Sequence, residues 1–199
     1  MKNFIINKTI NFITSQKDYD KTTIEELRYG LVSIYLTFSK FIIISALAII
    51  LGIFKEMLVL LIIYNILRVV SFGLHASKTW ICLVSSILIF IVGPIVCMNI
   101  EINNLVIAII SIITIPIIYR YSPADTKKRP IVNPRRRKVF KYLSTIFALV
   151  FCIVALTINN SFIINCLMLS LIIQCIVIHP YVYKLFGMSY DNYKNFKMN

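Results

Sequence analysis

The sequence of 199 residues has few charged side chains, and acidic ones are especially scarce. Charged residues make up 15% of the chain and hydrophobic residues 59%, against about 25% and about 45–50% in typical soluble proteins. A soluble domain of this length cannot bury so much apolar surface, and a disordered chain would have the opposite composition. The composition therefore predicts an integral membrane protein.

The sequence also lacks a CxxC pair and any cysteine spacing typical of a zinc site. Its five cysteines are odd in number and mostly lie inside apolar runs, which argues against a disulfide framework. Residues 1–30 contain no continuous apolar core of about 7–15 residues, so they are not typical of a cleaved signal peptide. We find no inverted repeat of the kind that many transporters show.

Six apolar segments of about 18–24 residues follow the mixed polar and apolar stretch 1–30, and about 20 helical residues are needed to cross a bilayer. The segments are roughly 31–54, 57–74, 80–100, 102–119, 139–158 and 161–178. We predict an all-α integral membrane bundle of six transmembrane helices within 31–185. An interfacial amphipathic helix within 1–30 would precede this bundle, and a tail, 186–199, would follow it.

Lys and Arg are distributed very unevenly between the two sides of this predicted bundle. With a cytoplasmic N-terminus, the inside regions hold 17 of them: five in 1–30, one at Lys78, eight in 120–138 and three in 179–199. The outside breaks hold only Lys55. Because cytoplasmic loops are rich in Lys and Arg, we predict a multi-pass protein of the cell membrane with both termini and the basic loop 120–138 in the cytoplasm. The 21 basic and 8 acidic residues would suggest nucleic acid in a soluble protein, but we expect no such partner here.

Three further basic residues lie inside the apolar segments. Lys40 and Lys141 lie toward cytoplasmic segment ends, where their side chains can reach the membrane surface and act as anchors. Arg68 lies about one and a half turns from the end of its segment. This greater depth favours a role in a functional site over anchoring alone.

The run from Arg68 to Cys82 contains the residues of greatest chemical interest. A cysteine nucleophile needs a base or a cation to hold its thiolate, and histidine is the usual base. His75 and Cys82 are seven residues apart, which on a straight helix means about 10.5 Å along the axis, whereas proton transfer needs roughly 3 Å. We therefore predict that the chain leaves helical geometry between them, with Gly73 and the polar stretch 77–79 locating the break.

If Thr79 caps the next helix, Cys82 lies in its first turn, where free N–H groups and the helix dipole favour an anion. Lys78 would add a positive charge nearby. The plainer alternative is that Cys82 is a small buried hydrophobe and His75 an interfacial residue. The other cysteines lie within apolar segments and are expected to serve packing alone: Cys97, Cys152, Cys166 and Cys175.

Other residues on the cytoplasmic side stay open as candidates. His179, after the last apolar segment, is a rival base. Asp125 is a candidate for orienting a histidine, or else only a turn residue after Pro123. The basic run 135–138 suits an anionic lipid or an acidic peptide segment, or serves topology alone.

Two motifs in this sequence resemble those of the AgrB (accessory gene regulator protein B) family. The first is R-x4-G-x-H-x6-C, formed by Arg68, Gly73, His75 and Cys82, and the second is YSPADTKKRPI, residues 121–131. The length, the six segments and the basic loop also match. The resemblance covers roughly residues 25–185, and the two motifs at this spacing are specific.

This resemblance implies a membrane-embedded cysteine endopeptidase of Gram-positive quorum sensing, acting as a homodimer without metal or cofactor, with its active site on the cytoplasmic side. The substrate would be an AgrD-like precursor peptide. Cleavage releases its acidic C-terminal part, and the remaining thioester is closed by an internal cysteine or serine into a thiolactone or lactone. His75 and Cys82 would be the catalytic pair. Supporting or substrate-binding residues would be Arg68, Gly73, Lys127, Lys128 and Arg129, with Asp125 as the candidate orienting residue.

A small six-helix transporter or exporter of a peptide or ion is the alternative. Its support is limited to the six segments and the charges within them. Replacement of Cys82 by alanine distinguishes the two functions, because it abolishes processing by a peptidase and leaves a transporter largely working.

Overall fold

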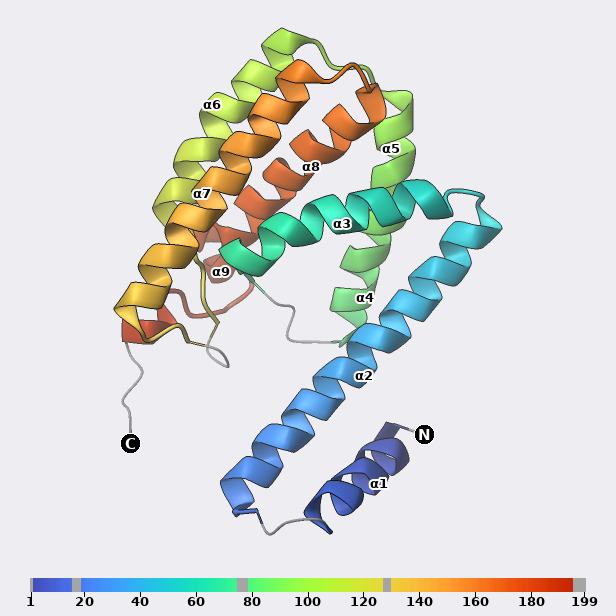
Figure 1. Ribbon diagram of the computed structural model, residues 1–199, viewed down its shortest axis with the longest axis vertical. Helices are drawn as coiled ribbons and strands as arrows, with labels where there is room; N and C mark the ends of the chain where they lie inside the picture. The colour runs from blue at the N-terminus through green and yellow to red at the C-terminus, as the bar shows by residue number, and fades with distance from the viewer. Residues whose placement is uncertain (1, 16–18, 75–78, 127–129, 195–199) are drawn as a thin grey trace. The chain divides into compact units, whose positions relative to one another are not determined.

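The computed structural model describes residues 2–15, 19–74, 79–126 and 130–194 of the chain (Figure 1). Within these residues the regular structure is helical and contains no β-strand, which confirms the prediction of an all-α fold. The chain divides into two compact units, Met1–Ile50 and Leu51–Asn199, each with its own packing.

The first unit consists of two helices, α1 (Lys2–Thr14) and α2 (Lys21–Ile50). Ile6 and Ile10, one helical turn apart, are buried where α1 packs on α2. α2 starts earlier than the first apolar segment, so residues 21–30 form its first turns and do not belong to a separate N-terminal element. The interfacial position of the N-terminal helix stays a prediction.

The centre of the second unit is formed by three helices, which lie side by side in Figure 1: α6 (Asn104–Tyr121), α7 (Pro134–Thr157) and α8 (Ser161–Ile178). Each pair of them is in contact, and α8 is the most buried candidate span. Asparagine side chains fix the starts of all three helices by accepting hydrogen bonds from free backbone N–H groups; these N-caps are Asn103, Asn133 and Asn160.

α3 (Phe54–Ser71) runs across this group and packs on α7 and α8 (Figure 1). It corresponds to the second predicted segment, but it carries Lys55, Glu56 and Arg68. Five other helical stretches of the described chain are long and apolar enough to cross a membrane: Thr22–Ile50, Trp80–Asn99, Asn104–Tyr121, Pro134–Thr157 and Ser161–Ile178. The protein is therefore a multi-pass helical membrane protein, and a sixth crossing by α3 stays a prediction, as does the cytoplasmic position of the termini.

The stretch Trp80–Asn99 combines α4 (Thr79–Ile87), a π-helical turn at Leu88–Val92, and α5 (Gly93–Asn99). The wide turn ends two residues before Pro94, whose ring and missing N–H group interrupt the regular α-helical hydrogen bonds. Gly93 brings the backbone close to α3, because a Cβ atom there would lie 2.9 Å from Leu60 Cδ2.

The basic loop is shorter than the predicted range 120–138. α6 continues to Tyr121, and α7 begins at Pro134, so the cations at 135–138 lie within the first two turns of α7. Asn133 as N-cap and Pro134 at the first helical position favour this early start. After α8 the chain forms a short helix, α9 (Pro180–Leu185), and a 3₁₀ turn, η2 (Asn192–Lys194).

Candidate active site

The helix is interrupted between Arg68 and Cys82 of the first motif, as predicted. α3 ends at Ser71 and α4 begins at Thr79, so residues 68–90 do not form one straight helix. Phe72 and Gly73 have φ values of 56° and 120°, conformations that end an α-helix. The helix therefore ends at the strap formed by residues 72–74, which includes Gly73, one of the two places where the break was predicted.

The strap is fixed to two distant parts of the chain by backbone hydrogen bonds. The Gly73 N–H group donates to the Ala124 carbonyl (2.8 Å), and the Ala124 N–H group donates to the Ser71 carbonyl (3.1 Å). The Leu74 N–H group donates to the Val177 carbonyl at the end of α8 (2.8 Å). The first motif, the second motif and α8 therefore meet at this strap.

Arg68 holds the strap from the α3 side. Its guanidinium donates to the carbonyl oxygens of Phe72 (2.5 Å), Gly73 (3.3 Å) and Leu74 (2.7 Å). A planar group with several fixed donors is suited to three such acceptors. The buried Gln174 side chain adds a fourth bond, from Nε2 to the Phe72 carbonyl (2.8 Å). Arg68 thus organises the backbone that leads directly into His75.

Gly73 has no room for a side chain. A Cβ atom would collide with the Arg68 guanidinium and lie 2.9 Å from the Val177 carbonyl oxygen. Its φ of 120° is also unfavourable for any L side chain. The glycine is therefore required both by its conformation and by the close approach of Arg68.

Cys82 lies in the first turn of α4, as predicted, and is partly buried. Tyr64 of α3, one turn before Arg68, lies within electrostatic range of the Cys82 thiol. The other four cysteines are buried inside helices. Their burial agrees with the packing role expected of them.

Several predicted site residues lie outside the described part of the chain. These are His75, Lys127, Lys128 and Arg129. The pairing of His75 with Cys82 therefore stays a prediction. The described residues contain no group of His, Cys, Asp or Glu side chains suited to a metal ion.

Asp125 is buried and binds donors from three directions. Its carboxylate accepts hydrogen bonds from the backbone N–H groups of Asn192 and Tyr193 (both 3.0 Å) and Ile131 (3.3 Å). Arg137 completes the set with an ion pair of 3.3 Å. These four donors give Asp125 an architectural role, because it joins the second motif to α7 and to the C-terminal segment.

His179 has a structural position between α8 and α9. Its Nδ1 atom accepts a hydrogen bond from the Tyr181 N–H group (3.2 Å) and caps α9, and its ring packs edge-to-face on Tyr121. Nearby, Tyr183 donates from its hydroxyl to the carbonyls of Ala124 (3.3 Å) and Asp125 (3.1 Å). Burial raises the pKa of Tyr183, which keeps this donor protonated.

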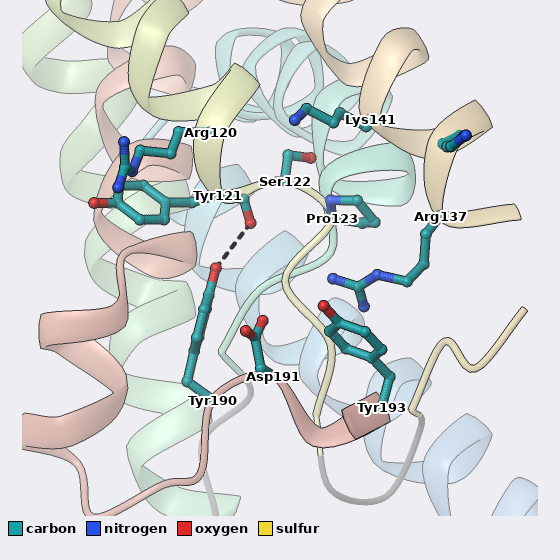
Figure 2. A pocket seen from close by; sticks show the side chains of 10 residues that line it. Arg120, Tyr121, Ser122, Pro123, Arg137, Lys141, Tyr190, Asp191 and Tyr193 are labelled. Atoms are coloured by element: carbon teal, nitrogen blue, oxygen red, sulfur yellow. Dashed lines mark hydrogen bonds between the residues drawn. The ribbon is translucent and has the colours of Figure 1, made fainter. Parts of the chain in front are cut away.

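A cleft of about 500 Å³ opens between the ends of α6 and α7 and the C-terminal segment. Figure 2 shows Arg120 and Tyr121 on the α6 side, Arg137 and Lys141 on the α7 side, and Tyr190 below Tyr121. The Tyr190 hydroxyl donates to the Tyr121 carbonyl (3.2 Å). No sequence pattern predicts this cleft, because its third wall comes from a tail without a recognisable motif.

These features define a multi-pass helical membrane protein in which a cysteine lies at the start of a candidate membrane-spanning helix, and in which an arginine fixes the strap that ends the preceding helix. The chain belongs to the Accessory gene regulator B (AgrB) family, whose sequence pattern matches residues 6–178. This family acts with the AgrD precursor peptide in the accessory gene regulator system of quorum sensing.

Individual relatives agree with this assignment. The accessory gene regulator protein B of Staphylococcus aureus is 32% identical over 182 residues, which cover 89% of this chain and 95% of that protein. A protein of Clostridium acetobutylicum described as AgrB-like is 30% identical over 172 residues, covering 86% of this chain and 82% of the relative. An AgrB-like protein of Listeria monocytogenes serovar 1/2a is 32% identical over 173 residues, which cover 86% of this chain and 84% of that protein. No solved structure matches the chain.

Proposed function

We propose that this protein is a membrane-embedded cysteine endopeptidase that cleaves an AgrD-like precursor and cyclises the product. The observation that carries the proposal is the position of Cys82 in the first turn of α4, eight residues along the chain after a strap that hydrogen bonds fix to Arg68, the second motif and α8. Free N–H groups at a helix start stabilise an anion, so this turn suits a thiolate nucleophile.

The proposed reaction proceeds in two acyl transfers. His75 takes the thiol proton, and the Cys82 thiolate attacks a backbone carbonyl of the precursor. The carbon–nitrogen bond breaks, and the departing amine of the acidic C-terminal part takes the proton from His75. His75 then takes the proton from an internal cysteine or serine of the precursor, whose sulfur or oxygen attacks the thioester carbonyl. The carbon–sulfur bond to Cys82 breaks, the Cys82 thiolate takes the proton back, and the thiolactone or lactone is closed.

We propose that the strap positions His75 for this role. Arg68 binds the carbonyls of the three residues immediately before it, and the Gly73 and Leu74 N–H groups are held by Ala124 and by α8. The backbone that enters His75 therefore has little freedom. Arg68 acts as a positioning residue here, and it does not need to contact the substrate.

Substrate capture and assembly complete the proposal. The basic residues Lys127, Lys128 and Arg129 of the second motif attract the acidic part of the precursor by their charge. Exclusion of water from a site at the membrane boundary favours ring closure over hydrolysis of the thioester. The protein acts as a homodimer with its active site on the cytoplasmic side of the cell membrane.

The test uses the full-length protein in lipid vesicles with a synthetic precursor, and mass spectrometry of the products. Cys82→Ala should yield no cleaved or cyclic product, whereas the matched control Cys152→Ala, in the buried interior of α7, should process the precursor. A precursor whose internal nucleophile is replaced by alanine should accumulate a hydroxylamine-sensitive acyl adduct on Cys82. Continued cleavage by Cys82→Ala would refute the proposal.

A further inference from the structure

The cleft between α6, α7 and the C-terminal segment has a strong excess of positive charge. Four cationic side chains line it, Arg120, Arg137, Lys138 and Lys141, and only one acidic residue, Asp191. The first turn of α7 contains no acidic residue, so the positive end of its helix dipole adds to these cations instead of being compensated.

The described acidic groups neutralise little of this charge. Asp125 pairs with Arg137, and Asp191 pairs with Lys194. Among the residues that the structure describes, Arg120, Lys138 and Lys141 have no carboxylate within ion-pair distance. The Lys141 ammonium lies over the Tyr119 ring at 4.2 Å from its centroid, and Figure 2 shows it pointing from α7 toward the cleft. The cleft therefore has cations available for an anionic ligand.

The cleft also lies at the end of a candidate membrane span. Arg120 and Tyr121 are the last residues of the span formed by α6, and Lys141 lies two turns inside α7, opposite them. Tyr119 and Tyr142, on the same two helices, are 48% and 57% exposed. Exposed tyrosines mark the boundary between the hydrocarbon core and water, and basic pockets between helix ends at this boundary suit anionic headgroups.

We propose that this cleft is a binding site for the phosphate group of an anionic phospholipid, held chiefly by Arg120, Lys138 and Lys141. The volume of about 500 Å³ is large enough for a glycerol phosphate headgroup, whose acyl chains would leave along the apolar faces of α6 and α7. A lipid is favoured over an acidic peptide because the cations lie at the membrane boundary beside exposed tyrosines. This site is separate from Cys82 and does not depend on peptidase activity.

Bound lipid would also influence the C-terminal segment. Tyr190 and Tyr193 form one wall of the cleft, and the Arg137 guanidinium lies over the Tyr193 ring at 3.5 Å from its centroid. A phosphate in the cleft would lower the mutual repulsion of the α7 cations that line it, including Arg137, which contacts this wall. The site thus links the lipid composition of the membrane to the packing of the segment that Asp125 fixes.

The test measures binding of phosphatidylglycerol to the full-length protein in a neutral detergent by native mass spectrometry, with phosphatidylcholine as the uncharged comparison. The double variant Arg120→Gln/Lys141→Gln should bind phosphatidylglycerol about 25-fold more weakly, since each cation near a membrane surface is worth about a fivefold change in affinity. The matched control Arg135→Gln/Arg136→Gln removes the same charge from exposed positions of α7 that do not line the cleft. The affinity of this control for phosphatidylglycerol should stay within about twofold of the wild-type affinity.

Lys138→Gln provides a second variant at an exposed position, where folding is not at risk. It should weaken the binding of phosphatidylglycerol about fivefold. Equal losses in the cleft variant and in the Arg135/Arg136 control would overturn the proposal, because the attraction would then be diffuse. If free glycerol 3-phosphate displaces phosphatidylglycerol at equal concentration, the cleft binds a soluble phosphate as well as a lipid, and the proposal of a lipid site is overturned. Displacement by an acidic peptide would assign the cleft to a peptide ligand and overturn the proposal as well.

Discussion

Replacement of Asp125 by asparagine should release the C-terminal segment and lower the stability of the second unit. The carboxylate is 1% exposed and accepts bonds from Arg137 and from the N–H groups of Ile131, Asn192 and Tyr193. An amide keeps one acceptor oxygen and presents an N–H₂ group to donors, so at least the ion pair and one N–H bond are lost. Hydrogen bonds to a charged group contribute about 1.5–3 kcal/mol each, and breaking a buried ion pair costs about 3–5 kcal/mol.

Because these terms overlap, we expect a total loss of about 3–5 kcal/mol, mostly from the unpaired Arg137. For a chain of this size this corresponds to a fall in melting temperature of roughly 6–20 °C. The buried cysteines of α5, α7 and α8 make the measurement direct, since a thiol-reactive dye in detergent reports their exposure on heating. Limited proteolysis should also cut Asp125→Asn earlier within 186–194.

Asp191→Asn is the matched control, because that carboxylate pairs with Lys194 on the surface, where an ion pair contributes little. It should melt within about 2 °C of the wild type. If Asp125→Asn melts equally close to the wild type and its tail resists protease equally well, the architectural role assigned to Asp125 is wrong. Its role would then have to lie in the reaction, as orienting residue for His75.

Four further predictions concern the strap and its surroundings. Gly73→Ala should abolish processing and destabilise the protein by about 2–4 kcal/mol, because of backbone strain and overlap with Arg68. The control Gly187→Ala, at positive φ in open space, should lower the free energy of unfolding by only about 1 kcal/mol. Equal melting temperatures of the two variants would contradict this reasoning. Arg68→Lys should lose at least two of three carbonyl bonds and lower the rate of processing about tenfold or more, and a normal rate in the precursor assay would show that Arg68 is only an anchor. Cys82→Ser should bind precursor in a pull-down but not cleave it, because a hydroxyl ionises far less readily than a thiol; loss of binding would indicate a structural role instead. Because burial raises the pKa of Tyr183, the folded state holds its proton more tightly than the unfolded state, so the free energy of unfolding should fall as pH rises above about 10, and Tyr183→Phe should reduce this slope in alkaline melting curves.

Much of the fold could be predicted because apolar length is a direct signal of a membrane-spanning helix. The segment 161–178 coincides with α8, and the first-turn position of Cys82 followed from the polar residues before it. The start of α7 was predicted too late, because its first turn contains cations in place of apolar residues. Asn133 and Pro134 gave the available signal, an N-cap followed by proline at the first helical position.

The partners of the polar residues could not be predicted. Arg68 binds backbone carbonyls, and Asp125 binds backbone N–H groups of residues 192 and 193. Backbone groups are the same at every position, so such partners leave no pattern in the sequence. The sequence indicates only that an arginine and a carboxylate in an apolar chain need polar partners, and not which groups those partners are.

The strap gives a physical reason why the two motifs occur together in this chain. The first motif needs Gly73 because Arg68 and the Val177 carbonyl leave no space for a side chain. The second motif supplies Ala124, which is buried and small enough for its backbone to pair with the strap on both sides. Since Asp125 then fixes the next turn to α7 and to the C-terminal segment, a shift in any one of these elements would move the residue that precedes His75. The placement of the proposed base therefore depends on contacts between positions about 50 to 100 residues apart along the chain, and not on the local sequence between His75 and Cys82 alone.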